Sequence, residues 1–282
     1  MSRGAGATDA IQRVTGTAFI VAEYRAMENG AAHPLYHDSV VPIFLDARTH
    51  AAAERMVADF PAGVHAVQLR TRYYDDHLDA ALAGGCRQVV ILGAGLDTRG
   101  VRKATPGVVY FEIDDKDIVD FKRERLKEAG IEAPIVFITG NYVTDGLIQM
   151  LAAHGFDFGA RSYLIWEGNT MYLTRPVVLG VLEALRDRVK DFAISCDYVS
   201  EETIALNTGD PRTTRFVEHF AEMGAPWHFG VNDIGALARE AGMTVLDNTR
   251  MADLHRRFWP ERPMGAAFYD NYSICTLAPK WR

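Results

Sequence analysis

Cysteine is scarce in this chain of 282 residues, and long apolar runs are missing from it. The three cysteines, Cys86, Cys196 and Cys275, lie far apart and form no C-x-x-C pair, which favours reduced thiols over a zinc site or a disulfide framework. No stretch approaches the roughly 18 apolar residues of a membrane span. The opening MSRGAGATDA also lacks the apolar segment of a signal peptide. We therefore expect a cytoplasmic protein without a membrane partner.

An excess of positive charge is missing as well, since 30 Lys and Arg stand against 37 Asp and Glu, for a net charge of -7. A dedicated nucleic-acid surface usually brings an excess of Lys and Arg, so no nucleic-acid partner is expected. The 48% hydrophobic and 24% charged residues are ordinary for a globular enzyme. Nothing in the sequence indicates an oligomeric state.

Hydrophobic periodicity divides the chain into an N-terminal helical part and an alternating part. Helices are expected at residues 15–30, 49–60 and 63–85, each ending at a glycine or before a proline. From Gln88 onward, apolar runs alternate with helical segments. The predicted strands are 88–92, 107–114, 133–139, 161–167 and 191–199, and the helices between them are 116–130, 144–155 and 175–189. This order predicts a parallel sheet covered on both faces.

The alternation stops between residues 200 and 230, where Phe216, Phe220 and Met223 share one face of a helical segment. We predict a helical lid there, over the carboxyl edge of the sheet. A helix at 232–242, a strand at 243–249 and a final strand at 269–279 follow. Because the final strand comes after a longer connection, it is expected to pair antiparallel at the sheet edge.

The prediction is therefore one α/β domain over residues 1–282, with a mostly parallel seven-stranded sheet. Residues 15–86 form an N-terminal helical cap, 87–199 the cofactor-binding core, 200–230 the lid insertion and 231–282 the C-terminal part of the core.

Gly93 and Gly95 directly follow the strand QVVIL. Glycine lets a ligand approach the backbone closely, and ligands of parallel sheets bind at the carboxyl ends of the strands. A plain strand-to-helix turn is the alternative. A dinucleotide fingerprint would place a third glycine where Thr98 stands, and Asp97 beside it would repel a pyrophosphate. The turn therefore favours S-adenosylmethionine, which is cationic and lacks phosphate, over the nicotinamide cofactor of an oxidoreductase.

The second strand ends in the acidic run YFEIDD. Glu112 and Asp114 share one face of that strand because side chains alternate. An acid about 20 residues past the glycines can accept hydrogen bonds from both ribose hydroxyls. Asp114, as the last residue of the strand, is the favoured ribose ligand and Glu112 the alternative. Ordinary solvated acids at a strand end are the other interpretation.

Three ordered stretches, VVILGAGLDTRGVR, YFEIDDKDIVDFKRERL and LIWEGNTMYL, resemble the leucine carboxyl methyltransferase family of S-adenosylmethionine-dependent enzymes. The similarity is strongest to its bacterial branch, which includes polyketide carboxyl methyltransferases. The N-terminal TAFIVAEYRAMENGAAHPLYHD and the later GAPWHFG are also similar, so the resemblance covers about residues 15 to 278. It implies a Rossmann-like class I methyltransferase fold, S-adenosylmethionine as cofactor and methyl transfer to oxygen.

The resemblance also implies cofactor contacts at matched positions. Arg70, on the helix before the first strand, matches the arginine that meets the methionine carboxylate, and a guanidinium suits a two-point contact with a carboxylate. Arg72 is the neighbouring alternative. Gly93, with Gly95 in the same turn, matches the glycine beside the cofactor, and Asp114 matches the ribose acid.

Two further positions complete the implied cofactor site. The family places an acid followed by leucine near the adenine, where this chain has Asn141 and Tyr142. The asparagine oxygen can still accept a hydrogen bond from the adenine amino group. Glu167, at the end of the fourth strand, matches a glutamate near the cofactor's amino-acid end. Neither a catalytic residue nor a metal ligand is assigned.

The acceptor is expected to be a carboxylate of a small molecule or a peptide-like acid. A carboxylate with a pKa of about 4 is ionised at neutral pH and needs no general base, whereas a phenol with a pKa of about 10 usually needs one. His228, the one histidine placed near the lid, is expected to be structural or solvated. Arg25 is the weak candidate to receive the acceptor carboxylate. The alternatives are a hydroxyl or phenol acceptor, a tRNA-modifying member and an adenosyl-binding protein without activity.

Overall fold

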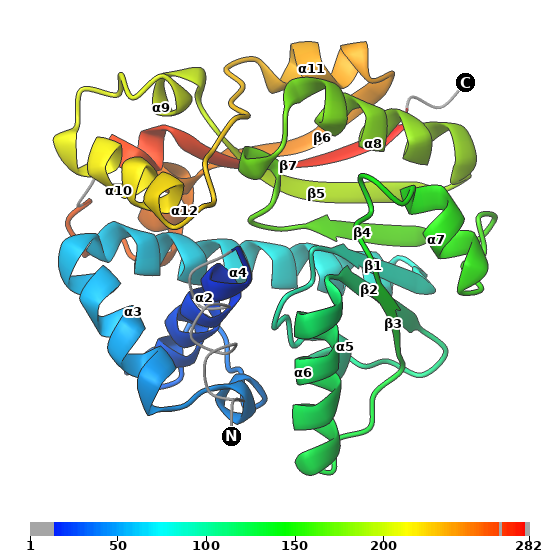
Figure 1. Ribbon diagram of the computed structural model, residues 1–282. Coiled ribbons are helices and arrows are strands. Elements are labelled where there is room, and N and C mark those ends of the chain that lie inside the picture. The colour runs from blue at the N-terminus through cyan, green and yellow to red at the C-terminus, as the bar shows by residue number, and fades with distance from the viewer. Residues whose placement is uncertain (1–13, 265–266, 280–282) are drawn as a thin grey trace.

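The computed structural model describes residues 14–264 and 267–279 and contains a seven-stranded sheet in the order β3-β2-β1-β4-β5-β7-β6 (Figure 1). The predicted α/β fold is confirmed. The strands are β1 (Gln88–Leu92), β2 (Val109–Asp114), β3 (Ile135–Thr139), β4 (Ser162–Trp166), β5 (Phe192–Val199), β6 (Met243–Arg250) and β7 (Tyr272–Pro279). The opening residues on which the absence of a signal peptide was argued lie outside the described part.

Strands β1 to β5 are parallel, and β7 runs antiparallel to both β5 and β6. The antiparallel pairing of the final strand is thus as predicted, but β7 lies one position in from the edge and β6 lies outside it. The burial of the two strands explains this order. Seven of the eight residues of β7 are buried, whereas β6 alternates between covered and exposed residues, as suits an edge strand with one solvated face.

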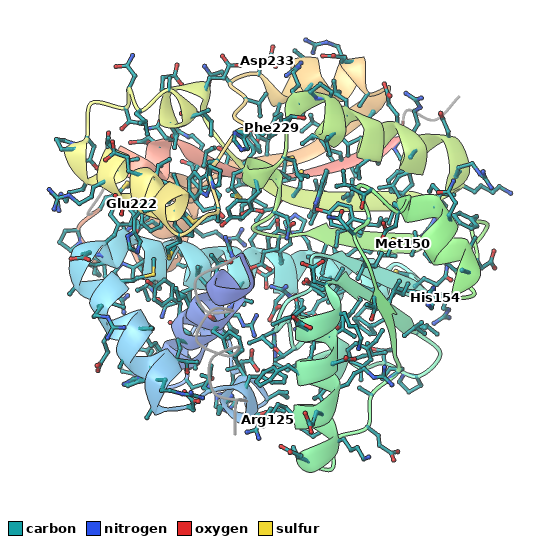
Figure 2. All side chains as sticks on the ribbon, viewed as in Figure 1. Arg125, Met150, His154, Glu222, Phe229 and Asp233 are labelled. Carbon is teal, nitrogen blue, oxygen red and sulfur yellow. The ribbon has the colours of Figure 1, made fainter. Side chains whose placement is uncertain are left out.

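Helices cover both faces of the sheet, as predicted. Helices α7 (Leu147–Ala153), α8 (Arg175–Arg188) and α11 (Ile234–Glu240) pack on one face, with Met150 and Phe229 among the side chains that fill the interior there (Figure 2). Helices α4 (Pro61–Ala83) and α12 (Met251–Phe258) pack on the other face. Within the described residues, no helix combines the length and the apolar character needed to cross a membrane.

Helix α6 (Lys116–Glu128), after β2, packs beside β2 and β3. Shorter helical segments are α5 (Arg99–Arg102) after β1 and the 3-10 turns η2 (Thr170–Tyr172) and η3 (Ala267–Asp270). Helix α12 was not predicted. It is eight residues long, and the polar run HRR in its last turn hides the apolar spacing of Met251 and Leu254.

The N-terminal helices form a cap beside the sheet, from α2 (Val14–Glu28), η1 (Val41–Phe44), α3 (Ala47–Asp59) and α4. Helix α3 begins earlier than predicted because the Asp46 carboxylate accepts the backbone N–H groups of Arg48 and Thr49. Helix α4 begins at Pro61, since proline is favoured in the first helical turn.

The predicted lid segment contains α9 (Glu201–Ile204) and α10 (Pro211–Glu222). Its apolar side chains Phe216, Phe220 and Met223 pack together, as the spacing predicted. They contact a cluster on α2, α3 and α4 that includes Tyr24 and Met56. Helix α10 therefore rests on the N-terminal helices, and its opening as a lid stays a prediction.

Candidate active site

A cavity of about 390 Å³ lies at the carboxyl ends of β1 to β4. The sheet order places it at the switch point, since the chain moves outward from β1 to β2 and β3 and then returns to the other side of β1 as β4. All seven predicted cofactor residues line this cavity: Arg70, Gly93, Gly95, Asp114, Asn141, Tyr142 and Glu167. The structure therefore brings the set together, and their contact with a cofactor stays a prediction.

The glycine turn is required by the fold as well as open to the cavity. Gly93 and Gly95 have φ values of +63° and +50°, a region that other residues enter at a cost. A Cβ on Gly93 would lie 2.1 Å from Nδ2 of Asn169. The backbone conformation and the contact with Asn169 require glycine at position 93 whether or not a ligand binds. This agrees in part with the interpretation of the turn as a plain strand-to-helix connection.

Asp114 lies at the cavity and Glu112 does not. The N–H groups of Gly95 and Asp115 donate to the two Asp114 oxygens at 2.6 and 2.7 Å, which orients the carboxylate at the floor of the cavity. Burial raises the pKa of Asp114, against the pull of those two donors. Glu112 instead forms a buried ion pair with Lys122, and burial raises the pKa of Glu112 to about 7. The alternative ribose ligand is therefore engaged elsewhere.

Asn141 and Tyr142, in the loop after β3, form hydrogen bonds within the chain that the sequence did not indicate. The Asn141 oxygen accepts the N–H of Val143 at 2.9 Å and so stabilises its own turn, which leaves the amide nitrogen as its outward polar group. The Tyr142 hydroxyl donates to Asn169 at 3.1 Å and accepts from Trp166 Nε1 at 2.9 Å. Tyr142 therefore presents a fixed ring to the cavity wall.

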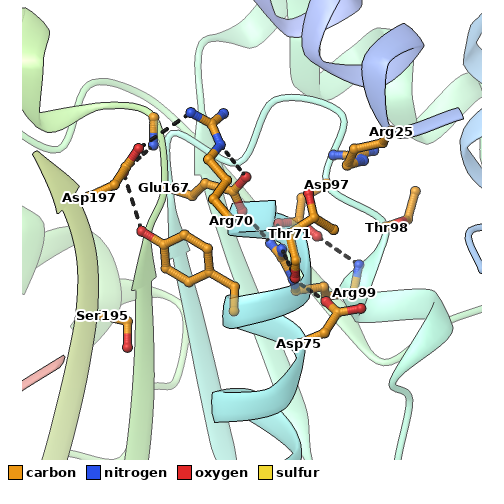
Figure 3. A network of polar contacts seen from close by, with 12 residues as sticks. Arg25, Arg70, Thr71, Asp75, Asp97, Thr98, Arg99, Glu167, Ser195 and Asp197 are labelled. Carbon is orange, nitrogen blue, oxygen red and sulfur yellow. Dashed lines mark hydrogen bonds and ion pairs between the residues drawn. The ribbon is translucent and has the colours of Figure 1, made fainter. Parts of the chain in front are cut away.

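Arg70 is buried, lines the cavity and contacts the carboxylates of Glu167 and Asp197 (Figure 3). Its Nε donates to Glu167 Oε1 at 2.9 Å, and its Nη1 contacts Asp197 at 3.3 Å and the Tyr272 hydroxyl at 2.8 Å. Its Nη2 lies 2.9 Å from the position that a Cβ on Gly168 would take. Two of the three nitrogens are thus bound within the chain, whereas the sequence interpretation expected a two-point contact with the cofactor.

The neighbouring arginine lies elsewhere. Arg72 pairs with Asp76 at 2.8 Å, donates to the Leu35 carbonyl and does not line the cavity. Of the two arginines, Arg70 is the one that lines the cavity, and it is also the one that the sequence interpretation favoured.

Arg99, which sequence reasoning missed, connects Glu167 to two further acids, Asp75 and Asp97. With 1% of its surface exposed, it donates to Asp75 at 2.8 Å, to Asp97 at 2.6 Å and to Glu167 Oε2 at 2.7 Å. Arg70 and Arg99 thus hold both oxygens of Glu167, which accounts for a carboxylate at a nearly buried strand end. Asp97 lines the cavity, but Arg99 already balances its charge, so it is no free anion as its position suggested.

Asp197, near the carboxyl end of β5, is a second residue that sequence reasoning missed. Its oxygens accept from the Gly168 N–H at 2.6 Å, from the Tyr74 hydroxyl at 3.2 Å, and from Arg70 and Tyr272. An ionisable residue inside the apolar run FAISCDYV was the available signal, because a buried carboxylate requires partners. Burial raises the pKa of Asp197, but four donors engage its oxygens and it does not line the cavity, so a ligand held there does not contact it.

A second, smaller pocket of about 80 Å³ adjoins the cavity. The two share Thr17, Val21, Arg70, Gly168 and Tyr172 in their walls. The rest of the smaller pocket is mostly aromatic or apolar and includes Tyr24, Met56, Met171, Phe216, Phe220, Trp227, Phe268 and Tyr272. We call it the aromatic pocket. Helix α10 of the predicted lid supplies part of its wall.

Two residues considered for the acceptor lie outside the aromatic pocket. Arg25 lines the larger cavity instead, where it donates to the Leu96 carbonyl and pairs with Asp38 at 3.4 Å. His228 is exposed, as expected for a solvated side chain, and none of the nine histidines lines either cavity.

The formal charges around the larger cavity favour a cationic ligand. Asp97 and Glu167 in its wall are already paired with Arg99 and Arg70, and Arg25 is paired with Asp38. Asp114 and Asp115 also line the cavity and form no ion pair within the described residues. Such a wall repels a pyrophosphate and attracts a sulfonium or an ammonium group. This disfavours a nicotinamide dinucleotide.

Comparison with known families and sequences agrees with this geometry. Residues 18–186 match the family model of leucine carboxyl methyltransferase. A relative from Mycobacterium bovis (strain BCG / Pasteur 1173P2), named "Putative S-adenosyl-L-methionine-dependent methyltransferase", is 35% identical over 178 residues. That match covers 58% of this chain and 59% of the relative, so the chain spans little more than half of the relative's length.

Solved structures with the same fold include two methyltransferases. A "putative methyltransferase" from Thermobifida fusca YX has a TM-score of 0.64 at 14% identity, over 99% of this chain and 100% of that one. The magnesium protoporphyrin IX methyltransferase of Synechocystis PCC 6803, solved with bound S-adenosylhomocysteine, has a TM-score of 0.51 at 12% identity, over 97% and 98%. At such identities the similarity shows the fold alone, a class I methyltransferase fold.

Proposed function

Because the chain belongs to the leucine carboxyl methyltransferase family, we propose that it is an S-adenosylmethionine-dependent O-methyltransferase that converts a carboxylate of a small organic acid into a methyl ester. The larger cavity would hold the cofactor and the aromatic pocket the acceptor. The single observation that carries the proposal is the junction of the two cavities, where Asp114 and Glu167 line the larger cavity and the described residues of the aromatic pocket's wall include no His, Lys, Asp or Glu.

The residues of the larger cavity fit S-adenosylmethionine part by part. The oriented Asp114 carboxylate suits the ribose hydroxyls, and the ring of Tyr142 offers an apolar surface to the adenine. Glu167 is the acid of the wall that suits the ammonium and sulfonium groups. The Arg70 Nη2 is the positive group for the methionine carboxylate. When bound, the cofactor supplies a methyl group that passes to an acceptor oxygen and leaves S-adenosylhomocysteine.

The chain's own contribution is to position the acceptor and exclude water, since a sulfonium is already an activated methyl donor. The acceptor must arrive with a free electron pair. Around the junction Glu167 is held by two arginines, and Asp197 is engaged by four donors. A carboxylate, which needs no deprotonation at neutral pH, therefore fits this junction better than a phenol or an alcohol.

Asp114→Ala is expected to weaken the binding of S-adenosylhomocysteine by about 1.5–3 kcal/mol, the cost of losing hydrogen bonds to a charged group. Calorimetric titration measures this loss directly. Asp117→Ala, in the first turn of α6 and outside the cavity wall, is the matched control and should leave the affinity unchanged. Equal affinity of Asp114→Ala and the parent protein would remove Asp114 from the cofactor site.

The rate with a carboxylate acceptor is expected to be flat from about pH 6 upward, because the acceptor is ionised well below that pH. The experiment incubates methyl-labelled cofactor with a panel of carboxylic acids and phenols across pH 6 to 9. Mild alkali then releases methanol from methyl esters and leaves aryl methyl ethers intact.

Base-stable label on every accepted substrate, with a rate that rises with pH as a phenol or a base ionises, would overturn the carboxyl assignment in favour of a hydroxyl acceptor. Titration with NADH tests the oxidoreductase alternative. Binding of NADH in preference to S-adenosylhomocysteine would overturn the methyltransferase proposal itself.

A further inference from the structure

The aromatic pocket adjoins the proposed cofactor cavity, since five residues belong to both walls. A ligand seated in it meets the cofactor site at Arg70 and Gly168 and extends away from there toward Tyr24 and α10. At about 80 Å³ the pocket admits a compact group and no long chain.

We propose that the acceptor is a monocarboxylic acid with a compact, flat apolar body and one hydrogen-bond acceptor at its far end, and that the Tyr24 hydroxyl recognises that far end. This inference rests on the proposed function and names the substrate class of the same site. Tyr24 would then be a specificity-determining residue that contacts the acceptor away from the reacting oxygen.

The walls of the aromatic pocket favour a flat apolar body. Phe216 stacks on Phe60 with centroids 4.2 Å apart and meets Phe220 edge-on at 5.0 Å. Trp227 lies 5.3 Å from Phe220 and 6.4 Å from Tyr172. Rings that already pack in tilted and edge-on contacts offer faces and edges to another ring. A strongly polar body would instead lose its hydration without compensation.

Tyr24 supplies one of two buried polar atoms among the residues of this pocket that have no hydrogen-bond partner in the described part of the chain, and Trp227 Nε1 is the other. The Tyr24 side chain lines the aromatic pocket, only 3% of the residue is exposed, and its hydroxyl has no hydrogen-bond partner among the described residues. A buried hydroxyl without a partner costs about 1–3 kcal/mol. Because no described residue forms a hydrogen bond with this hydroxyl, a ligand atom would be its hydrogen-bond partner.

The hydroxyl would act as a donor. Burial raises the pKa of Tyr24 above its usual range, so the phenol stays protonated at neutral pH. The acceptor carboxylate would lie at the other end of the pocket, where its wall is shared with the larger cavity and the sulfonium of the bound cofactor would supply the positive charge. A monocarboxylic acid with a distal acceptor atom matches this arrangement from end to end, whereas a second carboxylate would enter an apolar wall uncompensated.

Isonicotinate and benzoate provide a matched pair of probes, because they share size and charge and differ by one ring nitrogen that can accept from Tyr24. The parent protein should prefer isonicotinate over benzoate, and both over succinate, in kcat/KM. In Tyr24→Phe the isonicotinate value should fall about ten-fold, equivalent to about 1.4 kcal/mol. Benzoate should change less than two-fold.

Stability separates this role from a structural one. Tyr24→Phe should melt at the same temperature as the parent protein or higher, since it removes an unpaired buried hydroxyl. Its affinity for S-adenosylhomocysteine should also be unchanged. Tyr110→Phe is the control, because that buried hydroxyl bonds the Lys103 carbonyl away from both cavities. It should lower the melting temperature and leave the preference between the two acids intact.

A clear drop in the melting temperature of Tyr24→Phe, or an unchanged ratio between the two acids, would overturn the inference. Calorimetric titration of both acids into protein loaded with S-adenosylhomocysteine repeats the comparison without turnover. Discrimination that depends on Tyr24 in binding, with no base-labile ester formed, would contradict the proposed function and the acceptor assignment, and only recognition of a bound acid by Tyr24 would stand. No binding of either acid would contradict the inference alone if other carboxylic acids are esterified.

Discussion

Arg99→Met is expected to lower the free energy of unfolding by about 3–5 kcal/mol, the cost of leaving buried charges without their partner. Arg99 bonds Asp75, Asp97 and Glu167 and has only 1% of its surface exposed, so the variant leaves three carboxylates short of a donor. Urea unfolding measures the loss. Arg175→Met is the control, because Arg175 pairs with Glu240 at the exposed surface. It should cost less than about 1 kcal/mol.

The free energy of unfolding lost in Arg99→Met should become smaller as pH falls. Burial opposes ionisation of Asp75, but Arg99 and Arg102 hold the pKa of Asp75 well below its usual range. In the parent protein this stabilisation is complete above the unfolded pKa of about 3.9 and is lost as pH falls through the lower folded pKa. Without Arg99, burial should raise the folded pKa values of the carboxylates. The gap between variant and parent should therefore narrow as pH falls from 7 toward about 4, and a constant gap would contradict the assigned role.

Gly93→Ala is expected to weaken S-adenosylhomocysteine binding at least 100-fold, equivalent to about 2.7 kcal/mol. The φ of +63° costs an alanine about 1–2 kcal/mol, and its Cβ would stand 2.1 Å from Asn169 Nδ2. Asn169 would have to move, which also releases Tyr142 from its hydrogen bond. Calorimetry gives the affinity, and thermal unfolding gives the accompanying loss of stability.

Gly180→Ala is the matched control for this substitution. Gly180 lies in α8, is exposed, and has open space where a Cβ would be added. Alanine is favoured over glycine in a helix by up to about 1 kcal/mol, so this variant should be slightly more stable and bind the cofactor product normally. Unchanged affinity in Gly93→Ala would show that the turn is required by the fold alone.

Local patterns account for most of what the sequence predicted. The alternation of apolar runs and helices, the glycine turn after β1 and the acid at the end of β2 each depend on neighbouring residues. The parallel order then brings these strand ends together at one edge. This is why Gly93 and Asp114 could be placed in one cavity from their positions alone, whereas Glu167 was assigned to it through the family resemblance.

The polar cluster under the cavity could not be predicted in the same way. Arg99 meets Asp75 across 24 positions in the chain and Glu167 across 68, and no spacing rule connects such partners. The sequence interpretation therefore treated Asp97 as a free charge and assigned the nitrogens of Arg70 to a ligand. The order of β6 and β7 in the sheet was also predicted wrongly. It depends on which of the two strands the distant parts of the core cover, and neighbouring residues do not show this.

The position of β7 makes assembly of the site depend on the last part of the sheet to be synthesised. Tyr272 enters with β7 and contacts both Arg70 and Asp197, although β1 to β5 emerge from the ribosome well before it. Until β7 inserts between β5 and β6, Asp197 lacks one of its donors and the edge strand β6 has no neighbour. A nascent chain that already carries every strand end of the larger cavity therefore still lacks Tyr272, the residue that contacts both Arg70 and Asp197 and lines the aromatic pocket.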